Sequence, residues 1–186
     1  MVMEIEEVIV GSNTLSFDEY VELRLLAFSM YVTNAGIVYD PLLKFLREKN
    51  IDVFELISNS YSVTENAPEK IKNLFETYRK ATIDELWDSP KDIIENYQDE
   101  DEYQKLLDDK DGINIMRHYN ALVIAELMSD WSEHILKTGY DILKKNNILS
   151  PEIEKQYKAI SEYCKSISHN PLGRDRMNTN PEYLFE

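Results

Sequence analysis

Apolar residues recur along most of this chain at steps of three and four, the spacing of an α-helix with a buried face. In the densest stretch, 17–32, apolar side chains cover most of the helix circumference, and after the acidic first turn only Glu22, Arg24 and Ser29 interrupt them. A helix this apolar must be buried on several sides. The longest periodic run is 113–137, which is therefore the predicted central helix of a bundle. Its apolar positions form one broad face: Met116, Tyr119, Val123, Ile124, Leu127, Met128, Trp131 and Ile135.

Helix starts are marked by side chains that can accept hydrogen bonds from the first turn. Ser16 and Glu19 form a capping-box pattern, in which the serine hydroxyl accepts from the Glu19 N–H and the Glu19 carboxylate accepts from the Ser16 N–H. Asp52 and Glu55 repeat this pattern. Proline after a capping residue predicts further starts, because its missing N–H costs nothing at the first helical position. These starts are Asp40-Pro41, Ser89-Pro90 and Ser150-Pro151.

Together the patterns predict an all-α fold, a multi-helix bundle of about seven helices. The helices are expected to begin near residues 16, 40, 52, 68, 90, 113 and 151. The fifth passes through the acidic run 99–102. Gly139 is expected either to end the central helix or to kink it.

The segment ahead of the first helix has a different pattern. Val8-Ile9-Val10 is a short β-branched run bounded by Gly11, which predicts a strand or an extended arm with no obvious partner in this chain. No later segment alternates convincingly as a strand does. The predicted organisation is an extended arm at 1–15, a helical bundle domain at 16–168 and a loop-like tail at 169–186.

Charge and cysteine content narrow the function. The chain has 35 acidic and 20 basic side chains and a formal charge of −15, which disfavours binding to nucleic acid or to anionic lipid. Proteins and small molecules are the expected partners. Arg24 and Glu126 break the most apolar runs well short of a membrane span, and the acidic N-terminus lacks the pattern of a secretory signal. A single cysteine, Cys164, excludes an internal disulfide, so a cytoplasmic location is expected.

One group of side chains on the central helix has the spacing of a metal or proton-transfer site. Glu126, Asp130 and His134 lie four residues apart and therefore on one face. A single helix does not supply the second ligand pair that di-metal bundles use. A surface stripe with a helical Asp–His pair is the favoured interpretation, and the sequence predicts no catalytic residues.

Part of an EF-hand calcium-binding pattern matches the sequence, with its third, fifth and sixth places at Asp109, Asp111 and Gly112. The first place is Leu107 and the twelfth is His118, so two key oxygen ligands are missing. A solvated charged face is the better interpretation. The sequence near His118 contains no paired nucleophile and no glycine-rich phosphate loop, so no catalytic role is predicted for this histidine.

Two further features have a weaker chemical signal. Cys164 lies beside Lys165 but on an apolar helical face, which is typical of an inert core cysteine. Arg174 and Arg176 form a local basic pair in the polar tail, where they can bind an anion or an acidic partner surface. A structural loop is the favoured interpretation of this tail.

The segment Glu7-Val8-Ile9-Val10-Gly11-Ser12-Asn13-Thr14-Leu15-Ser16-Phe17-Asp18-Glu19-Tyr20, with Glu22-Leu23-Arg24 after it, carries a family resemblance. It resembles the segment that follows the catalytic barrel in radical S-adenosylmethionine (SAM) proteins of the cobalamin-binding type. There a short strand passes through a turn into a helix that begins with an acidic residue and an aromatic. The last residues, 180–186, are also similar to the start of a C-terminal segment in such proteins.

The resemblance implies a C-terminal helical region of a larger enzyme. The family's Cys-x-x-x-Cys-x-x-Cys motif, its barrel strands and its cobalamin motif are absent here, so none of its catalytic residues transfer. A 4Fe-4S cluster, S-adenosylmethionine and cobalamin would belong to the parent protein, and no cofactor is expected in this chain.

The first functional hypothesis is therefore a noncatalytic accessory domain that covers the barrel or contributes to recognition of a substrate or partner. Its partner would be the N-terminal catalytic barrel. The alternative is a free-standing acidic helical module that binds another protein. An enzyme that uses the helical stripe of two carboxylates and a histidine is the least favoured.

Overall fold

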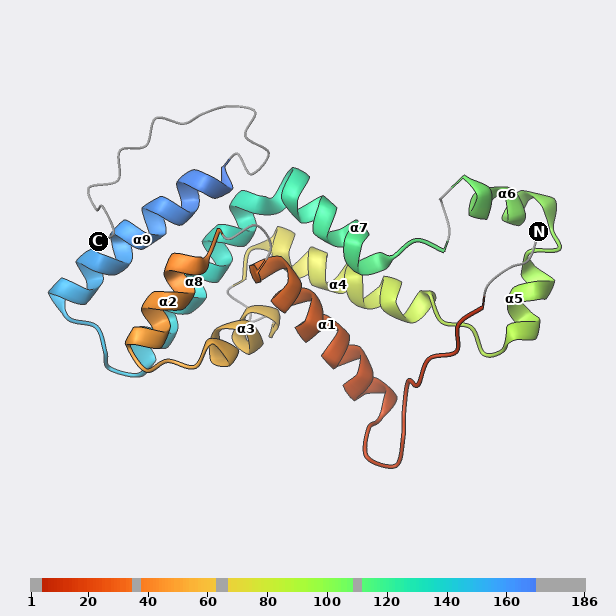
Figure 1. The fold of residues 1–186 in the computed structure, drawn as a ribbon, viewed down its shortest axis with the longest axis horizontal. Coiled ribbons are helices and arrows are strands. Elements are labelled where there is room, and N and C mark those ends of the chain that lie inside the picture. The colour runs from red at the N-terminus through yellow and green to blue at the C-terminus, as the bar shows by residue number, and fades with distance from the viewer. Residues whose placement is uncertain (1–4, 35–37, 63–66, 109–111, 170–186) are drawn as a thin grey trace.

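The computed structural model describes residues 5–34, 38–62, 67–108 and 112–169 of the 186-residue chain. These residues confirm the predicted all-α, multi-helix bundle (Figure 1). The helices are α1 (Phe17–Asn34), α2 (Asp40–Glu48), α3 (Val53–Tyr61), α4 (Glu69–Asp84), α5 (Pro90–Asn96), α6 (Glu100–Leu107), α7 (Ile115–Leu122), α8 (Met128–Lys145) and α9 (Pro151–Ser168). None of the described helices is long and apolar enough to cross a membrane.

Local hydrogen bonds explain where the helices begin. The Ser16 N–H donates to Glu19 Oε2 at 2.7 Å, and the Glu19 N–H donates to Ser16 Oγ at 3.2 Å, so the predicted capping box is confirmed. The backbone hydrogen bond from Ser16 holds the pKa of Glu19 below its usual value. Asp52, Ser89 and Ser150 cap α3, α5 and α9, as the sequence predicts.

The second helix starts one residue earlier than predicted. Tyr39 is its N-cap, Asp40 is its first residue, and no side chain makes a capping hydrogen bond there. In the turn after the helix, Asn50 adopts a left-handed φ of 57° and its N–H donates to the Arg47 carbonyl. Asparagine tolerates this conformation better than most residues.

The predicted fifth segment is two helices, because an aspartate within the acidic run caps the second of them. Asp99 Oδ1 accepts hydrogen bonds from the N–H groups of Asp101 and Glu102, at 3.0 and 3.1 Å. As the structure describes them, neither α5 nor α6 contains a buried residue. In Figure 1 they lie at one end of the elongated molecule, and α9 lies near the other.

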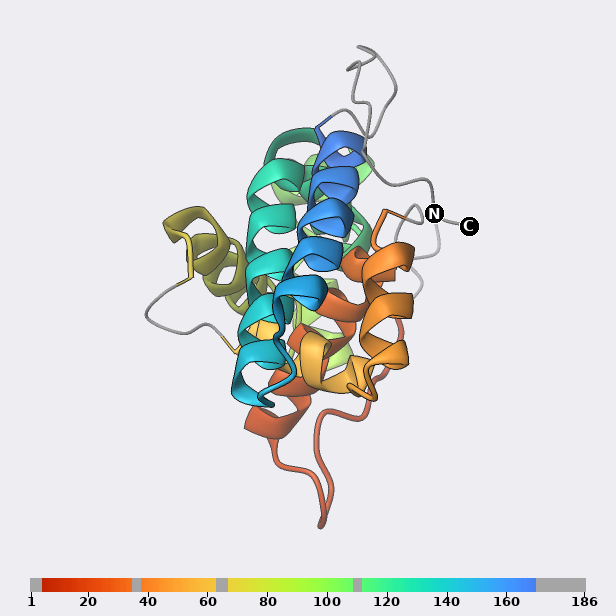
Figure 2. The ribbon, with the colours of Figure 1, turned by 90° about the vertical axis from the view of Figure 1, so that its left-hand side faces the viewer.

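The long predicted helix is the centre of the bundle. α7, a five-residue π segment (Val123–Leu127) and α8 follow one another without a break from residue 115 to residue 145. α8 contacts α2, α3, α4 and α9, and Figure 2 shows α8 and α9 side by side. Its buried residues are Met128, Trp131, Ser132, His134, Ile135, Leu136, Gly139, Ile142 and Leu143.

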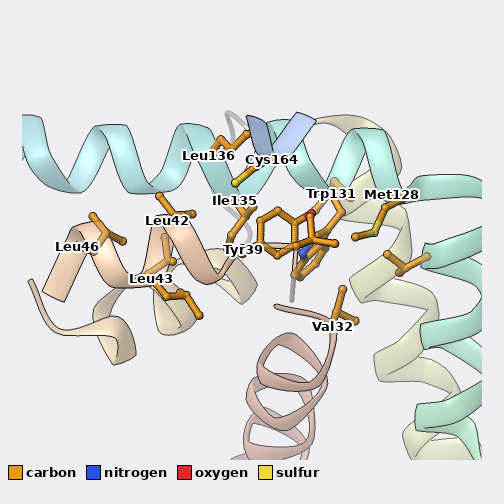
Figure 3. Packing of buried hydrophobic residues seen from close by; sticks show 14 of the residues in the cluster. Val32, Tyr39, Leu42, Leu43, Leu46, Met128, Trp131, Ile135, Leu136 and Cys164 are labelled. Atoms are coloured by element: carbon orange, nitrogen blue, oxygen red, sulfur yellow. The ribbon is translucent and has the colours of Figure 1, made fainter. Parts of the chain in front are cut away.

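The centre of the core joins α8 to the start of α2. Trp131 and Tyr39 are fully buried, and Figure 3 shows Tyr39 beside Trp131 and Ile135. The Tyr39 hydroxyl hydrogen-bonds the hydroxyl of Ser132 at 2.5 Å, so its buried polar end is satisfied. Leu136 of α8 lies close to Cys164 of α9 in the same view.

The first residues described, 5–15, precede α1 as an extended arm. Among the described residues the arm has no strand ladder, and its one β-bridge joins Ser12 to Leu15 within the arm itself. Val8 and Ile9 are 52% and 81% exposed. The predicted tail lies outside the described residues except for His169.

Gly139 does not end the central helix, which continues to Lys145. A Cβ atom at position 139 would lie 2.6 Å from the Tyr157 hydroxyl oxygen and 3.4 Å from Leu42 Cδ1. The Tyr157 hydroxyl donates to the Leu136 carbonyl at 2.5 Å, which fixes that oxygen against α8. Glycine is therefore required here because α9 approaches α8 closely.

Gly139→Ala is expected to lower the free energy of unfolding by about 1–3 kcal/mol, because the new methyl group must displace the buried Tyr157 ring. This loss outweighs the roughly 1 kcal/mol by which alanine favours a helix over glycine. Urea denaturation followed by circular dichroism measures the change.

Tyr157→Phe provides the control, since it removes the oxygen that the methyl group would strike. It should itself cost about 1 kcal/mol through the lost hydrogen bond. In that background Gly139→Ala should cost less than in the native chain. Equal costs in both backgrounds would contradict the steric explanation.

Candidate functional site

The three predicted metal-ligand candidates have different surroundings in the structure. Asp130 forms an ion pair with Lys70 of α4, with 2.9 Å between Oδ2 and Nζ. His134 is buried, and its Nε2 lies 2.7 Å from the Ser60 carbonyl oxygen. Glu126 is exposed. In the described parts of the chain, no group of three or more His, Cys, Asp or Glu side chains could hold a metal ion.

The π segment explains in part why Glu126 does not lie on one face with Asp130 and His134. Glu126 belongs to it, whereas Asp130 and His134 belong to α8. A π-helix has a wider turn than an α-helix, so residues four apart no longer stack on one face. The periodicity in the sequence assumes a regular α-helix, and the tertiary fold changes the register.

His134 has a structural role that its sequence position does not reveal. Its partner is a carbonyl oxygen, so Nε2 must carry the proton and donate it. The Ser60 hydroxyl in turn donates to Ile57 O and contacts the hydroxyl of Ser29, which connects α8 to both α3 and α1. Burial lowers the pKa of His134 below 6.5, because the imidazolium form would lose its hydration.

Cys164 lies in the core, as the sequence predicts. Its side chain is fully buried, and burial raises the pKa of the thiol to about 12. A thiol held neutral in this way is a poor nucleophile and a poor metal ligand.

The remaining sequence candidates add no described site. His118 is exposed, and its ring lies 5.5 Å from that of its neighbour Tyr119. Arg174 and Arg176, the predicted anion- or partner-binding pair, lie outside the described residues. Asp109 and Asp111 of the rejected calcium pattern do so as well.

A groove that the sequence did not predict lies between the arm, α1, the end of α4 and the start of α7. A pocket of about 520 Å³ is bounded by Val8 of the arm, Arg24 of α1, Glu85 after α4 and Arg117 of α7. A second hollow, of about 480 Å³, shares the residues Tyr31 and Met116 with it. The second hollow is mostly apolar and is completed by Ala27, Met30 and Asn34. Together they form the arm groove.

Two charged side chains that line the arm groove, Arg24 and Glu85, form an ion pair. Arg24 Nη2 lies 2.7 Å from Glu85 Oε1, and a second ion pair joins Arg79 of α4 to Glu22 of α1, with 2.6 Å between Nη2 and Oε1. Burial raises the pKa of Glu85, and the positive charge of Arg24 opposes that shift. Arg24 Nε is buried without a hydrogen-bond partner in the described chain.

The groove can accept a partner group with both apolar and hydrogen-bonding surface. Its lining includes a charged pair that is partly removed from water, and its extension along α1 is apolar. Partly desolvated charges beside an apolar hollow are typical of binding sites. The sequence shows Arg24 as an interruption of an apolar helix, which is a signal that could have indicated the site.

Stability is expected to fall as the pH is lowered through the pKa of His134. Because the folded pKa lies below 6.5, the unfolded chain binds this proton first, and acid favours unfolding. The stabilisation is complete above about pH 6.5 and is lost progressively as the pH falls through the lower folded pKa.

His134→Gln is the variant that tests this, since glutamine can donate to Ser60 but does not titrate. Urea denaturation between about pH 7 and 5.5 should show a steeper loss of stability for the native chain than for the variant. Parallel pH profiles would show that His134 is not the titrating group.

Searches of protein-family models, of curated proteins and of solved structures found no match to this chain.

Proposed function

We propose that this chain is a noncatalytic helical accessory domain that binds a protein surface through its extended arm and the arm groove. The observation that supports the proposal best is the exposure of the arm, where Val8 and Ile9 are 52% and 81% accessible. Such β-branched side chains are normally buried, and full burial of each contributes about 1.5–3 kcal/mol.

The backbone of the arm supports the same proposal. An extended segment without a strand ladder in the described chain presents N–H and C=O groups that a neighbouring strand can pair. Addition of a strand to a sheet edge is a common mode of recognition, in which main-chain bonds give affinity and alternate side chains give specificity. The apolar arm and the groove beside it therefore form one docking face.

The family resemblance supplies a partner for this face. In radical SAM proteins the similar segment directly follows the catalytic barrel, so the arm would continue from the barrel and the helical bundle would cover it or help to recognise the substrate. The iron–sulfur cluster, S-adenosylmethionine and cobalamin would then be held by the parent and not by this chain.

The alternative is a free-standing acidic helical module that binds a separate protein through the same face. The bundle has its own core, in which Trp131, Tyr39 and Phe28 are fully buried. This favours a unit that folds without a partner protein. The formal charge of −15 favours a basic partner.

The length of the native polypeptide separates the two readings. The accessory-domain proposal expects that mass spectrometry of the protein from its source cells will give a mass far above 21.9 kDa, with bound iron and S-adenosylmethionine. A mass close to 21.9 kDa would exclude a domain fused to a barrel and leave the free-standing module.

Replacing both Val8 and Ile9 by Asp should weaken partner binding by about tenfold or more, because the arm would then bring charge into an apolar contact. The measurement is the amount of partner that the tagged variant retains, compared with the tagged native protein. If the chain is fused to the barrel, the measurement is the fraction of the barrel that is protected from proteolysis. Global unfolding should be unchanged, since both side chains are exposed.

Leu23→Asp is the matched control, because Leu23 is 52% exposed, as Val8 is, but does not border either hollow of the groove. This control should retain the partner. If the arm variant and the control behave alike, the arm is not the docking element.

A further inference from the structure

The segment that joins α4 to α7 contains a helix pair that contributes no buried residue to the fold. We call α5 and α6, with the residues from 87 to 108 that surround them, the α5–α6 hairpin. Neither helix, as described, has a buried residue, whereas α8 has nine. The core therefore does not depend on the hairpin, and much of the hairpin surface is exposed.

Apolar side chains lie on the outside of this hairpin. Ile94 of α5 is 49% exposed, Leu107 of α6 is 47% exposed, and Trp87 just ahead of α5 is 43% exposed. The other tryptophan, Trp131, is fully buried. Large apolar side chains that are exposed on one segment of the chain are typical of an interaction surface.

The hairpin is built to keep its shape before a partner arrives. Ser89 caps α5, with Pro90 in its first turn, and Asp99 caps α6 through two backbone hydrogen bonds. The ring centroids of Trp87, ahead of α5, and Tyr97, the C-cap of α5, are 6.4 Å apart. These capping hydrogen bonds favour the helical form of α5 and α6 before a partner binds. Preorganisation of this kind lowers the entropy cost of binding.

The negative charge of the hairpin indicates the chemistry of a partner surface. Residues 88–108 include eight acidic and two basic side chains. The two lysines form ion pairs within their own helices, Lys91 with Glu95 and Lys105 with Glu102. A surface this acidic repels nucleic acid, anionic lipid and a second copy of a chain with charge −15.

We propose that the α5–α6 hairpin is a second docking element of this chain, for a basic protein surface. The partner surface has Lys and Arg side chains around an apolar centre, and a basic amphipathic helix is its simplest form. The apolar residues of the hairpin meet the apolar centre, and the acidic residues meet the surrounding positive charges. This inference rests on the proposed docking function and adds the chemistry of the surface that it recognises.

The probe is a short amphipathic helical peptide made of leucine and lysine, titrated into the full chain. Trp87 reports on the hairpin, because the other tryptophan is already buried. Saturable binding with a blue shift of tryptophan emission is expected, and Trp87→Phe should abolish the shift. Absence of binding by calorimetry would overturn the proposal.

Two comparisons separate a docking surface from simple attraction of opposite charges. Replacing Ile94 and Leu107 by Asp makes the hairpin more acidic, yet should weaken peptide binding by about tenfold or more, because the apolar contact is lost. A peptide of the same composition, scrambled so that it has no apolar face, should also bind about tenfold more weakly than the amphipathic one.

Phe54→Asp is the matched control, as Phe54 is 56% exposed on α3, away from the hairpin. It makes the same kind of apolar-to-acidic change and should leave peptide binding unaltered. Equal binding of the two peptides, or equal weakening by Phe54→Asp and by the hairpin variant, would overturn the proposal.

Failure of this test is distinguishable from failure of the proposed function. Native mass and retention of the partner report on the arm and on the parent protein, whereas the peptide titration reports on α5 and α6. A chain that binds its partner through the arm but ignores the peptide would refute the hairpin proposal alone.

Discussion

Burial of α8 on several sides is the constraint on which the rest of the structure depends. α2, α3, α4 and α9 all contact this helix, and its residues Trp131, Ile135 and Leu143 are fully buried. Because four helices pack against it, their positions depend on the shape of α8. Its small residues decide how closely they approach: Gly139 admits the Tyr157 hydroxyl of α9, and Ser132 receives that of Tyr39.

Three polar side chains in the core, those of Tyr39, His134 and Tyr157, form hydrogen bonds to other segments of the chain. His134 donates to a carbonyl of α3, and Tyr157 donates to a carbonyl of α8. A buried donor without a partner costs about 1–3 kcal/mol, so each of these bonds fixes the relative position of two helices. Side chains that suggest catalysis in the sequence, a histidine and a cysteine, therefore serve the packing of the bundle.

The surfaces proposed for binding lie outside that core. The arm before α1 and the hairpin between α4 and α7 contribute exposed apolar residues, and a partly desolvated ion pair lines the groove beside the arm. Figure 1 places the hairpin at the end of the molecule toward which the arm runs. Substitutions on these surfaces can change binding without unfolding the bundle, because the core does not depend on them.

The amino-acid sequence by itself determined the fold class and most helix starts. Capping by Ser16, Asp52, Ser89 and Ser150 joins groups only two or three residues apart, so the chemistry is complete within the segment. The apolar face of the central helix was likewise visible, since periodicity along one helix needs no knowledge of its neighbours. The division of the fifth helix was missed because the capping role of Asp99 was not distinguished from a charged run.

Only the tertiary structure decided how distant side chains combine. Asp130 pairs with Lys70, sixty residues away, and Arg24 pairs with Glu85, 61 residues away, so neither partner could be read from local spacing. The arm groove exists because α1, α4 and α7 diverge beside the arm, and the π segment separates residues that a regular helix would align. Pockets and ion pairs depend on relative helix positions, which are set by packing of the whole core and not by any one stretch of sequence.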